Sequence, residues 1–153
     1  VLAGALFQLL SKIFVVIGII IMLYFMGMDL HLANPLLLLA CFFLLWVLSV
    51  SLGLSLGIAE LLVTEVAKVR QLVERPMFII SGVFFSLQDI PREYWHFMDW
   101  NPILHGIELS RFAVRATYGS DSVSLSYLSG TVLVFSFFSI SVYHISWKQG
   151  ISR

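Results

Sequence analysis

The most constraining feature of the sequence is a run of 24 residues, positions 36–59, that contains no charged side chain. A helix of about 20 apolar residues is long enough to cross the hydrocarbon core of a bilayer. Asn34 and Pro35, directly before the run, are typical of a helix start. Across the chain 59% of residues are hydrophobic and only 12% are charged, about half the charged share of soluble domains. The sequence therefore predicts an all-α protein whose helices lie in lipid.

Three further segments predict membrane passes. The segments 5–28 and 122–147 are long and apolar, and Lys12 in the first can extend its amine to the near interface. Only 13 uncharged residues separate Arg75 from Asp89, so a third pass must begin earlier and cover about 69–88. Polar residues near Arg75 would then lie at membrane depth and face protein or water. The alternative is a short helix with Arg75 at the interface.

We therefore expect a polytopic membrane helical bundle, with four transmembrane helices in a single transmembrane domain over residues 1–153. The passes lie at about 5–28, 36–59, 69–88 and 122–147. Lys and Arg dominate on the side that holds both ends and the loop 60–75, with six basic residues against three acidic ones. Basic residues favour the cytoplasmic side. We expect both ends of this segment in the cytoplasm and the stretch 89–121 outside.

The stretch 60–75, between the second and third passes, predicts an amphipathic helix. Leu62, Val66, Val69 and Val73 share one helical face, and opposite charges stand at i,i+3 and i,i+4 spacing. Either this helix is simply solvated, or its charges dock a cytoplasmic partner. The charged residues that could couple the chain to such a partner are Glu60, Glu65, Lys68, Arg70 and Glu74.

The external stretch 89–119 is too polar to span the membrane and too apolar for a simple loop. It predicts two short helices, 91–98 and 102–118, with Gly119 able to end the second. One polar stripe on the second helix consists of His105, Glu108, Arg111 and Arg115. Aromatic residues gather on the first helix and its exit, namely Tyr94, Trp95, Phe97 and Trp100. Tyr and Trp often anchor at the membrane interface; the functional alternative is a re-entrant helical hairpin that guards an exit.

Small residues repeat at four-residue spacing on two of the expected passes. Ser49, Gly53 and Gly57 share one face of the second pass, and Ser126 and Gly130 do so on the last. Small residues let helix backbones approach closely in lipid. These faces predict helix packing, either within one subunit or between two copies of the chain.

The sequence contains no recognisable catalytic or metal-binding pattern. Cys41 is the only cysteine, and it predicts a small apolar core residue. The phosphate-loop, zinc-protease and serine-hydrolase motifs are missing, so we expect no enzyme activity. His105 and Glu108 stand one helical turn apart, which favours simple polar pairing over a metal site. The formal net charge of zero gives no bulk attraction for nucleic acid.

The sequence contains R-P-x-F-x-x-S-G-x-F-F from Arg75 and W-N-P-x-x-H from Trp100. With two shorter stretches, these motifs resemble the C-terminal half of type-2 ABC exporter permeases. The pattern R-P-x-F-x-x-S-G-x-F-F together with W-N-P-x-x-H is closest to the capsular-polysaccharide export branch, of the KpsM/BexB kind. The resemblance covers nearly the whole chain. Its matching stretches are residues 75–86, 90–91, 100–105 and 108–111.

The resemblance implies a six-pass permease of the bacterial inner (cytoplasmic) membrane, with this chain forming passes three to six and upstream sequence missing before Val1. Such permeases work as homodimers with separate ATP-binding subunits. ATP and Mg would then bind the partner, and this chain would bind no cofactor. The expected cargo is a lipid-linked polysaccharide, handed to periplasmic and outer-membrane export proteins, with membrane lipids as surroundings and no nucleic acid as partner.

The resemblance suggests two ways in which this chain could contact the polymer. Aromatic rings would stack on sugars, and arginines would attract anionic groups. The candidate residues of the substrate path are Arg75, Tyr94, Trp95, Trp100, His105, Glu108, Arg111 and Arg115. Three alternatives stay open: an ABC exporter of lipids or drugs with the same fold, a non-transporting membrane scaffold, and, with least support, a membrane enzyme.

Overall fold

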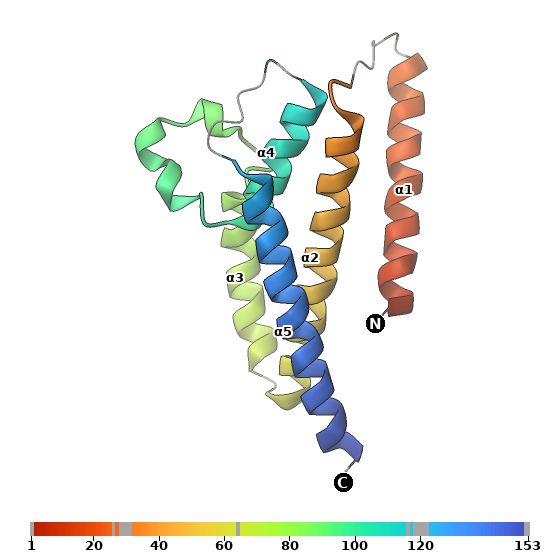
Figure 1. Cartoon of the computed structure of the whole chain (residues 1–153), viewed down its shortest axis with the longest axis vertical. Coiled ribbons are helices and arrows are strands. Elements are labelled where there is room, and N and C mark those ends of the chain that lie inside the picture. The colour runs from red at the N-terminus through yellow and green to blue at the C-terminus, as the bar shows by residue number, and fades with distance from the viewer. Residues whose placement is uncertain are drawn as a thin grey trace. The chain divides into compact units, whose positions relative to one another are not determined.

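The structure is a computed structural model that describes residues 2–25, 27, 32–63, 65–115, 117 and 123–151. These residues form helices and no strand, so the all-α prediction is confirmed for this part of the chain. The fold divides into two compact units, Val1–Leu32 and Ala33–Arg153, each described below by itself. The α-helices are α1 (Leu2–Phe25), α2 (Pro35–Leu62), α3 (Val66–Ile80), α4 (Pro102–Val114) and α5 (Leu125–Ile151), with 3₁₀ helices η1 (Leu87–Asp89) and η2 (Arg92–Phe97) (Figure 1).

Three helices of the described chain are long and apolar enough to cross a membrane. The spans are Ala3–Met22, Pro35–Leu62 and Leu125–Ser146, which fall on the first, second and last of the expected passes. The unit Val1–Leu32 contains α1, and none of the residues Ala3–Met22 is buried. A helix that is apolar on all sides is typical of a membrane span.

The expected third pass has a different form. Helix α3 ends at Ile80 and does not continue to residue 88, because Gly82 adopts a positive φ of 76° that side chains with a Cβ avoid. At ~1.5 Å per residue, the 15 residues of α3 and the 13 of α4 extend about 22 and 20 Å, less than the ~30 Å of a hydrocarbon core. Neither spans alone, and the count of four passes stays a prediction.

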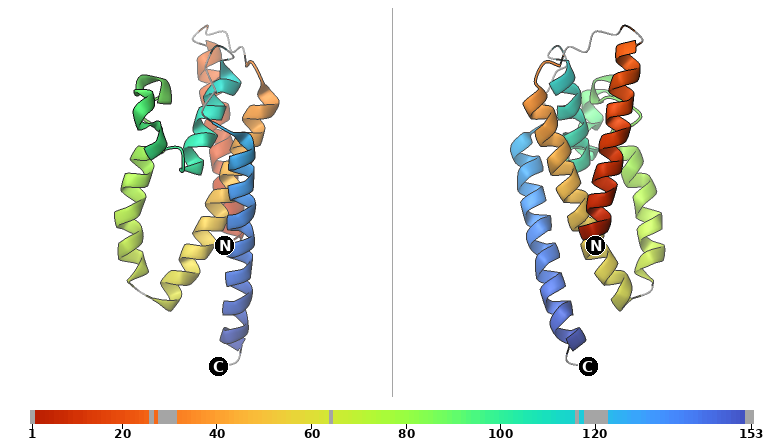
Figure 2. Two further views of the ribbon diagram at one scale, coloured as in Figure 1. Left: turned by 60° about the vertical axis from the view of Figure 1, so that its left-hand side comes forward. Right: turned by 90° about the vertical axis from the view of Figure 1, so that its right-hand side faces the viewer.

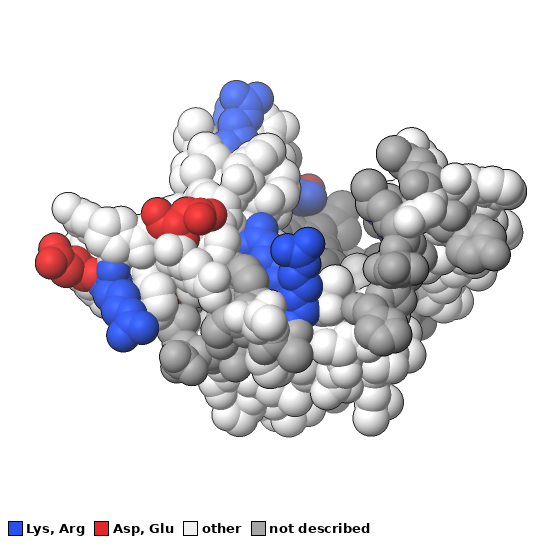
Figure 3. Space-filling view, turned by 90° about the horizontal axis from the view of Figure 1, so that it is seen from above, with Lys and Arg blue, Asp and Glu red and all other residues white. Residues whose placement is uncertain are grey.

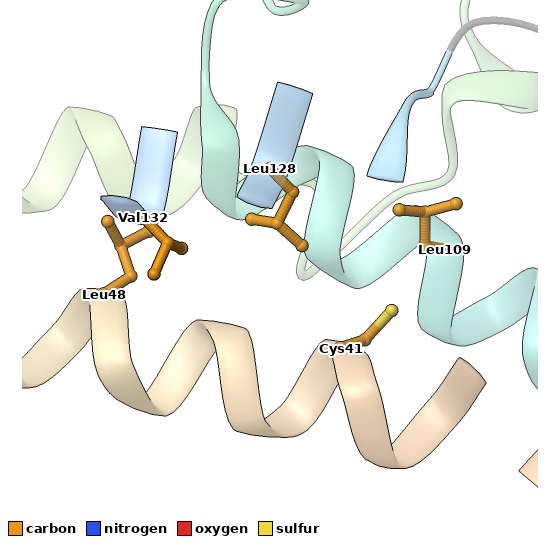
Figure 4. Close-up of a cluster of buried hydrophobic side chains, with 5 residues drawn as sticks. All are labelled: Cys41, Leu48, Leu109, Leu128 and Val132. Atoms are coloured by element: carbon orange, nitrogen blue, oxygen red, sulfur yellow. The ribbon is translucent and has the colours of Figure 1, made fainter. Parts of the chain in front are cut away.

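The core of the unit Ala33–Arg153 lies where α2, α4 and α5 meet. Cys41 and Leu48 of α2, Leu109 of α4, and Leu128 and Val132 of α5 are buried against one another (Figure 4). Cys41 is thus the apolar core residue that the sequence predicts. Its burial helps to fix α4 between the two long helices.

Helix α4 packs on α2 through a close contact at Gly106. A Cβ at this position would lie 2.6 Å from Leu45 Cδ2, so only glycine allows the two helices to approach this far. Helices α2 and α5 meet through polar atoms as well, since the hydroxyls of Ser51 and Ser136 lie 3.0 Å apart. Hydrogen bonds between helices stabilise such contacts in lipid.

The predicted stripes of small residues lie outside the contacts at Gly106 and Ser51. Ser49, Gly53, Ser126 and Gly130 are exposed in the described chain. A Cβ at Gly53, Gly57 or Gly130 would meet no described atom within 4 Å. That these faces pack against a helix, of the same subunit or of a second copy, therefore stays a prediction.

The segment between α3 and α4 turns the chain back on itself. A Cβ at Gly82, just after α3, would lie 2.6 Å from Leu104 Cδ1 in the first half of α4, so the end of α3 lies beside the start of α4. The first external helix, expected over 91–98, is the 3₁₀ helix η2, and α4 ends at Val114. The expected end at Gly119 lies outside the described residues.

The two ends of this unit's helices are tied differently. At one end the backbone N–H groups of Ala33 and Asn34 donate to the carbonyls of Val114 and Ala113, which joins the start of α2 to the end of α4. At the other end α2 and α3 connect through a short turn, and Figure 2 shows the two helices diverging from it. Helix α5 ends on the side of that turn (Figure 1).

Candidate functional site

Arg111 of α4 holds the backbone of the segment that follows α3. Its Nη2 atom donates to the carbonyl of Gly82 at 2.7 Å, and its Nη1 atom donates to the carbonyl of Phe85 at 2.8 Å. Nη1 also lies 2.6 Å from Oε1 of Glu108. The planar guanidinium group can serve several acceptors at once. We call this set of contacts the Arg111 clasp.

Glu108 completes the clasp from one helical turn earlier. Its side chain is 2% exposed, and Oε1 accepts a hydrogen bond from the backbone N–H of Leu87 at 3.2 Å. A buried carboxylate is costly unless it is paired and hydrogen-bonded, and here it is both. The segment 82–87 is therefore fixed to α4 by both its carbonyl and its amide groups.

His105 joins α4 to the start of α5. The imidazole is 4% exposed; Nε2 lies 2.7 Å from the carbonyl of Asp99, and Nδ1 lies 3.1 Å from the backbone nitrogen of Ser124. A carbonyl can only accept and an amide N–H can only donate. The contacts therefore define a neutral tautomer with its proton on Nε2.

The turn before α4 is fixed by the same group of residues. The Tyr127 ring is tilted against the His105 ring, with the two centroids 4.6 Å apart, and the Tyr127 hydroxyl donates to the carbonyl of Trp100 at 2.7 Å. Asn101 caps α4 by accepting from the N–H of Ile103 at 3.0 Å. The buried atoms Asn101 Nδ2 and Asp99 Oδ1 find no hydrogen-bond partner among the described residues, so this turn has unused hydrogen-bonding capacity.

The aromatic residues between α3 and α4 differ in how far they are fixed by contacts. Trp95 is half-buried, donates from Nε1 to the carbonyl of Ile90 at 2.9 Å, and lies under the guanidinium of Arg92 at 5.6 Å. Tyr94 and Trp100 are 54% and 53% exposed. Trp100 nevertheless has a fixed orientation, because its Nε1 donates to the carbonyl of Phe97 at 2.7 Å.

The charged residues near the α2–α3 turn form a second cluster. Arg70 pairs with Glu74 on α3 and, at 3.0 Å, with Glu60 near the end of α2. Lys68 and Glu65 form an exposed pair at 3.6 Å. The expected amphipathic stretch is thus divided, since Glu60 belongs to α2 and Arg70 to α3. The Arg70–Glu60 pair bridges the two helices.

The two remaining candidate arginines lie apart from these contacts. Arg75 in α3 and Arg115 after α4 are both exposed. The face on which α4 ends carries both basic and acidic side chains among uncharged ones (Figure 3). Among the described residues, no three His, Cys, Asp or Glu side chains are grouped so that they could hold a metal ion.

The sequence matches a known protein family. Residues 1–114 match the family described as ABC-2 type transporter. The chain belongs to the ABC-2 type transporter family. The resemblance to type-2 ABC exporter permeases is thereby confirmed, and the long apolar helices agree with a membrane protein.

Two curated relatives also match the chain. Both are named Polysialic acid transport protein KpsM, from Escherichia coli, and each is 34% identical over 143 residues. The match covers 94% of this chain and 55% of each relative, so the chain spans about half of their length. No solved structure matches the chain.

Within this ABC-2 domain, several residues at the site were not among the sequence candidates. Gly82 and Gly106 permit close approach, and Ser124 and Tyr127 connect α5 to the turn before α4. A glycine inside the apolar pattern of α4 was the one available sign of close packing. Ser124, which donates to Nδ1 of His105, lies 19 residues further along the chain, and spacing along one helix cannot reveal such a partner.

Proposed function

We propose that this chain is part of the membrane permease subunit of an ATP-driven exporter that moves a capsular or related lipid-linked polysaccharide across the bacterial inner membrane. The observation that carries the proposal is the 34% identity with proteins named for polysialic acid transport, over 94% of the chain. In this proposal the ATP-binding subunit is a separate protein, and this chain catalyses no reaction. A second copy would complete the permease.

The helix lengths support a split crossing within the permease. Helices α3 and α4 are each too short to span, but together they lead from the α2–α3 turn to the opposite side. The irregular backbone between them would then begin at membrane depth. Such backbone is tolerated only where protein satisfies its polar groups, and the Arg111 clasp does this for Gly82 and Phe85. This arrangement favours the re-entrant hairpin over a simple external loop.

The exposed aromatic and basic residues are the best candidates for contact with polymer. Tyr94 and Trp100 expose ring faces that could stack on sugar rings. Arg75 and Arg115 are exposed and could attract acidic groups on the polymer or its lipid phosphate. Arg111 instead donates to backbone carbonyls, so we assign it, with His105 and Glu108, to supporting the hairpin.

The cluster at the α2–α3 turn is the proposed contact with the ATP-binding subunit. Arg70 links both helices there through Glu60 and Glu74, so a force on the turn would reach both. Lys68 and Glu65 lie exposed beside it. ATP-driven closure of the partner would push on this end and realign the hairpin on the other side.

Deletion of the gene, followed by complementation, tests the proposal. We expect the deletion strain to lose surface carbohydrate and to retain lipid-linked polymer inside the cell. We also expect the tagged protein to co-purify with a phosphate-loop ATPase. Retention of a small lipid or drug instead would favour the exporter alternative, and absence of any ATPase would favour the scaffold.

A further inference from the structure

Between its ends, α3 has little hold on the rest of the described chain. None of its residues is buried, and Val69, Leu72 and Val73 each expose more than half of their surface. Figure 2 shows that α3 diverges from α2 after the short turn that joins them. The contacts that fix α3 are therefore concentrated near its two ends.

The two attachments differ in strength. Near its start, Arg70 pairs with Glu60 across the turn, and both side chains are partly exposed, where solvent weakens an ion pair. Beyond its last turn, the Arg111 clasp binds three backbone groups between residues 82 and 87, with Glu108 nearly fully buried. The side chains of Arg111 and Arg70 are similarly exposed, at 30% and 37%, but Glu108 is 2% exposed whereas Glu60 is 29% exposed. A charge-assisted bond to a buried carboxylate is the stronger kind. The end of α3 is thus fixed firmly to α4.

We propose that Arg111 and Glu108 are positioning residues that make α3 and α4 move as one body. A displacement of the α2–α3 turn would then pass along α3 and through the clasp to α4, and so to the opposite side of the membrane. This inference rests on the proposed function, because the ATP-binding subunit supplies the displacement. Neither side chain needs to touch the polymer.

Three substitutions distinguish the clasp from a simple ion pair. Arg111→Gln removes the charge and the fork of donors, whereas Arg111→Lys retains the charge but presents only a point donor. The exchange Glu108→Arg with Arg111→Glu retains an ion pair. A glutamate at 111 cannot donate to the carbonyls of Gly82 and Phe85, so the exchange restores function only if the ion pair alone matters.

A chemical cross-link tests whether the clasp acts by connecting the segment after α3 to α4. Val83 is exposed, and its carbonyl lies 3.5 Å from Nη2 of Arg111. The pair Val83→Cys and Arg111→Cys, in a Cys41→Ala background, is therefore treated with short bifunctional thiol reagents, and bridging is verified before export is measured. Each single-cysteine variant treated with the same reagent is the matched control.

The readouts are the amount of protein in the membrane, ATP hydrolysis by the purified complex, and surface carbohydrate on the cells. We expect Arg111→Gln and the exchange variant to hydrolyse ATP while surface carbohydrate falls roughly 5-fold or more. Bridging the cysteine pair should restore it. Normal export by the exchange variant, or no recovery in bridged and assembled protein, would overturn the proposal.

If Arg111→Gln does not accumulate, Arg111→Lys takes its place. Loss of export with continued ATP hydrolysis in Arg111→Lys supports the clasp, and export at the wild-type level overturns it. Measurements on the unmodified protein distinguish failure of this inference from failure of the proposed function. Absence of ATP-dependent export by the unmodified protein rejects that function, whereas uncoupling that bridging does not repair rejects only the shared movement of α3 and α4.

Discussion

His105 of α4 accepts a hydrogen bond from the backbone N–H of Ser124, the residue before α5, with Nδ1 3.1 Å from the nitrogen. Its Nε2 atom donates to the carbonyl of Asp99 on the other side of the ring. The imidazole thus connects three segments: the turn before α4, α4 itself and the start of α5. Because it is buried, no water can replace either contact without rearrangement.

Replacing His105 should loosen this junction. His105→Phe retains a ring next to Tyr127 but leaves the partly buried N–H of Ser124 and carbonyl of Asp99 without this partner, at a cost of up to about 1–3 kcal/mol each. We expect a lower free energy of unfolding for the purified protein in detergent, measured by thermal or denaturant titration. His96→Phe, at an exposed histidine, is the control, and equal effects of the two changes would contradict the junction.

Enlarging Gly106 should separate α4 from α2. A Cβ there would lie within 3 Å of three Leu45 atoms, and overpacking of this kind costs about 1–3 kcal/mol. We therefore expect Gly106→Val to lower the free energy of unfolding more than Gly53→Ala, where the space is open among the described residues. Gly106→Ala should also lower the free energy of unfolding. Adding Leu45→Ala to Gly106→Ala removes the clashing side chain and should recover part of that stability.

Removing the exposed external rings should reduce export without unfolding the protein. Tyr94→Ala and Trp100→Ala remove faces proposed to stack on sugar rings, while Trp100→Phe retains one. We expect surface carbohydrate to fall in the alanine variants and to stay near the wild-type level in Trp100→Phe, at equal protein levels. Trp95→Ala should act mainly on stability, because Trp95 is half-buried and bonded to Ile90.

Breaking the Arg70 bridge should weaken the response to the ATP-binding subunit. Arg70→Gln removes both ion pairs, including the one that joins α3 to α2. We expect less ATPase subunit to co-purify, or less export per ATP hydrolysed, with little change in unfolding, because the pair is partly exposed. Gln71→Ala, at the exposed neighbouring position, is the control. Full coupling in Arg70→Gln would remove this bridge from the mechanism.

The sequence predicted the long helices well because their signal is local. A run of apolar residues without charge, such as 36–59, needs no partner to be recognised. Asn34 caps α2 as expected, with its side chain accepting from the N–H of Leu37. The family resemblance also followed from short contiguous stretches of residues.

The form of the expected third pass could not be predicted from the same signals. A helix through residue 88 fits the apolar pattern, but the chain leaves the helix near Gly82, which adopts a positive φ at a place where Leu104 leaves no room for a Cβ. The polar stripe on α4 was visible, yet its partners were not. Arg111 donates to backbone carbonyls 26 and 29 residues away. Every residue has a backbone carbonyl, so the sequence does not show which ones a side chain will bind.

Cysteine labelling of intact spheroplasts tests most directly whether the chain is threaded through the membrane as proposed. In a Cys41→Ala background, Lys68→Cys and Arg92→Cys each place one thiol at an exposed position. We predict that an impermeant maleimide reacts with the cysteine at 92 at once and with the one at 68 only after the membrane is opened. Reaction at 68 without reaction at 92 would invert the topology, and with it both the ATPase contact and the external hairpin.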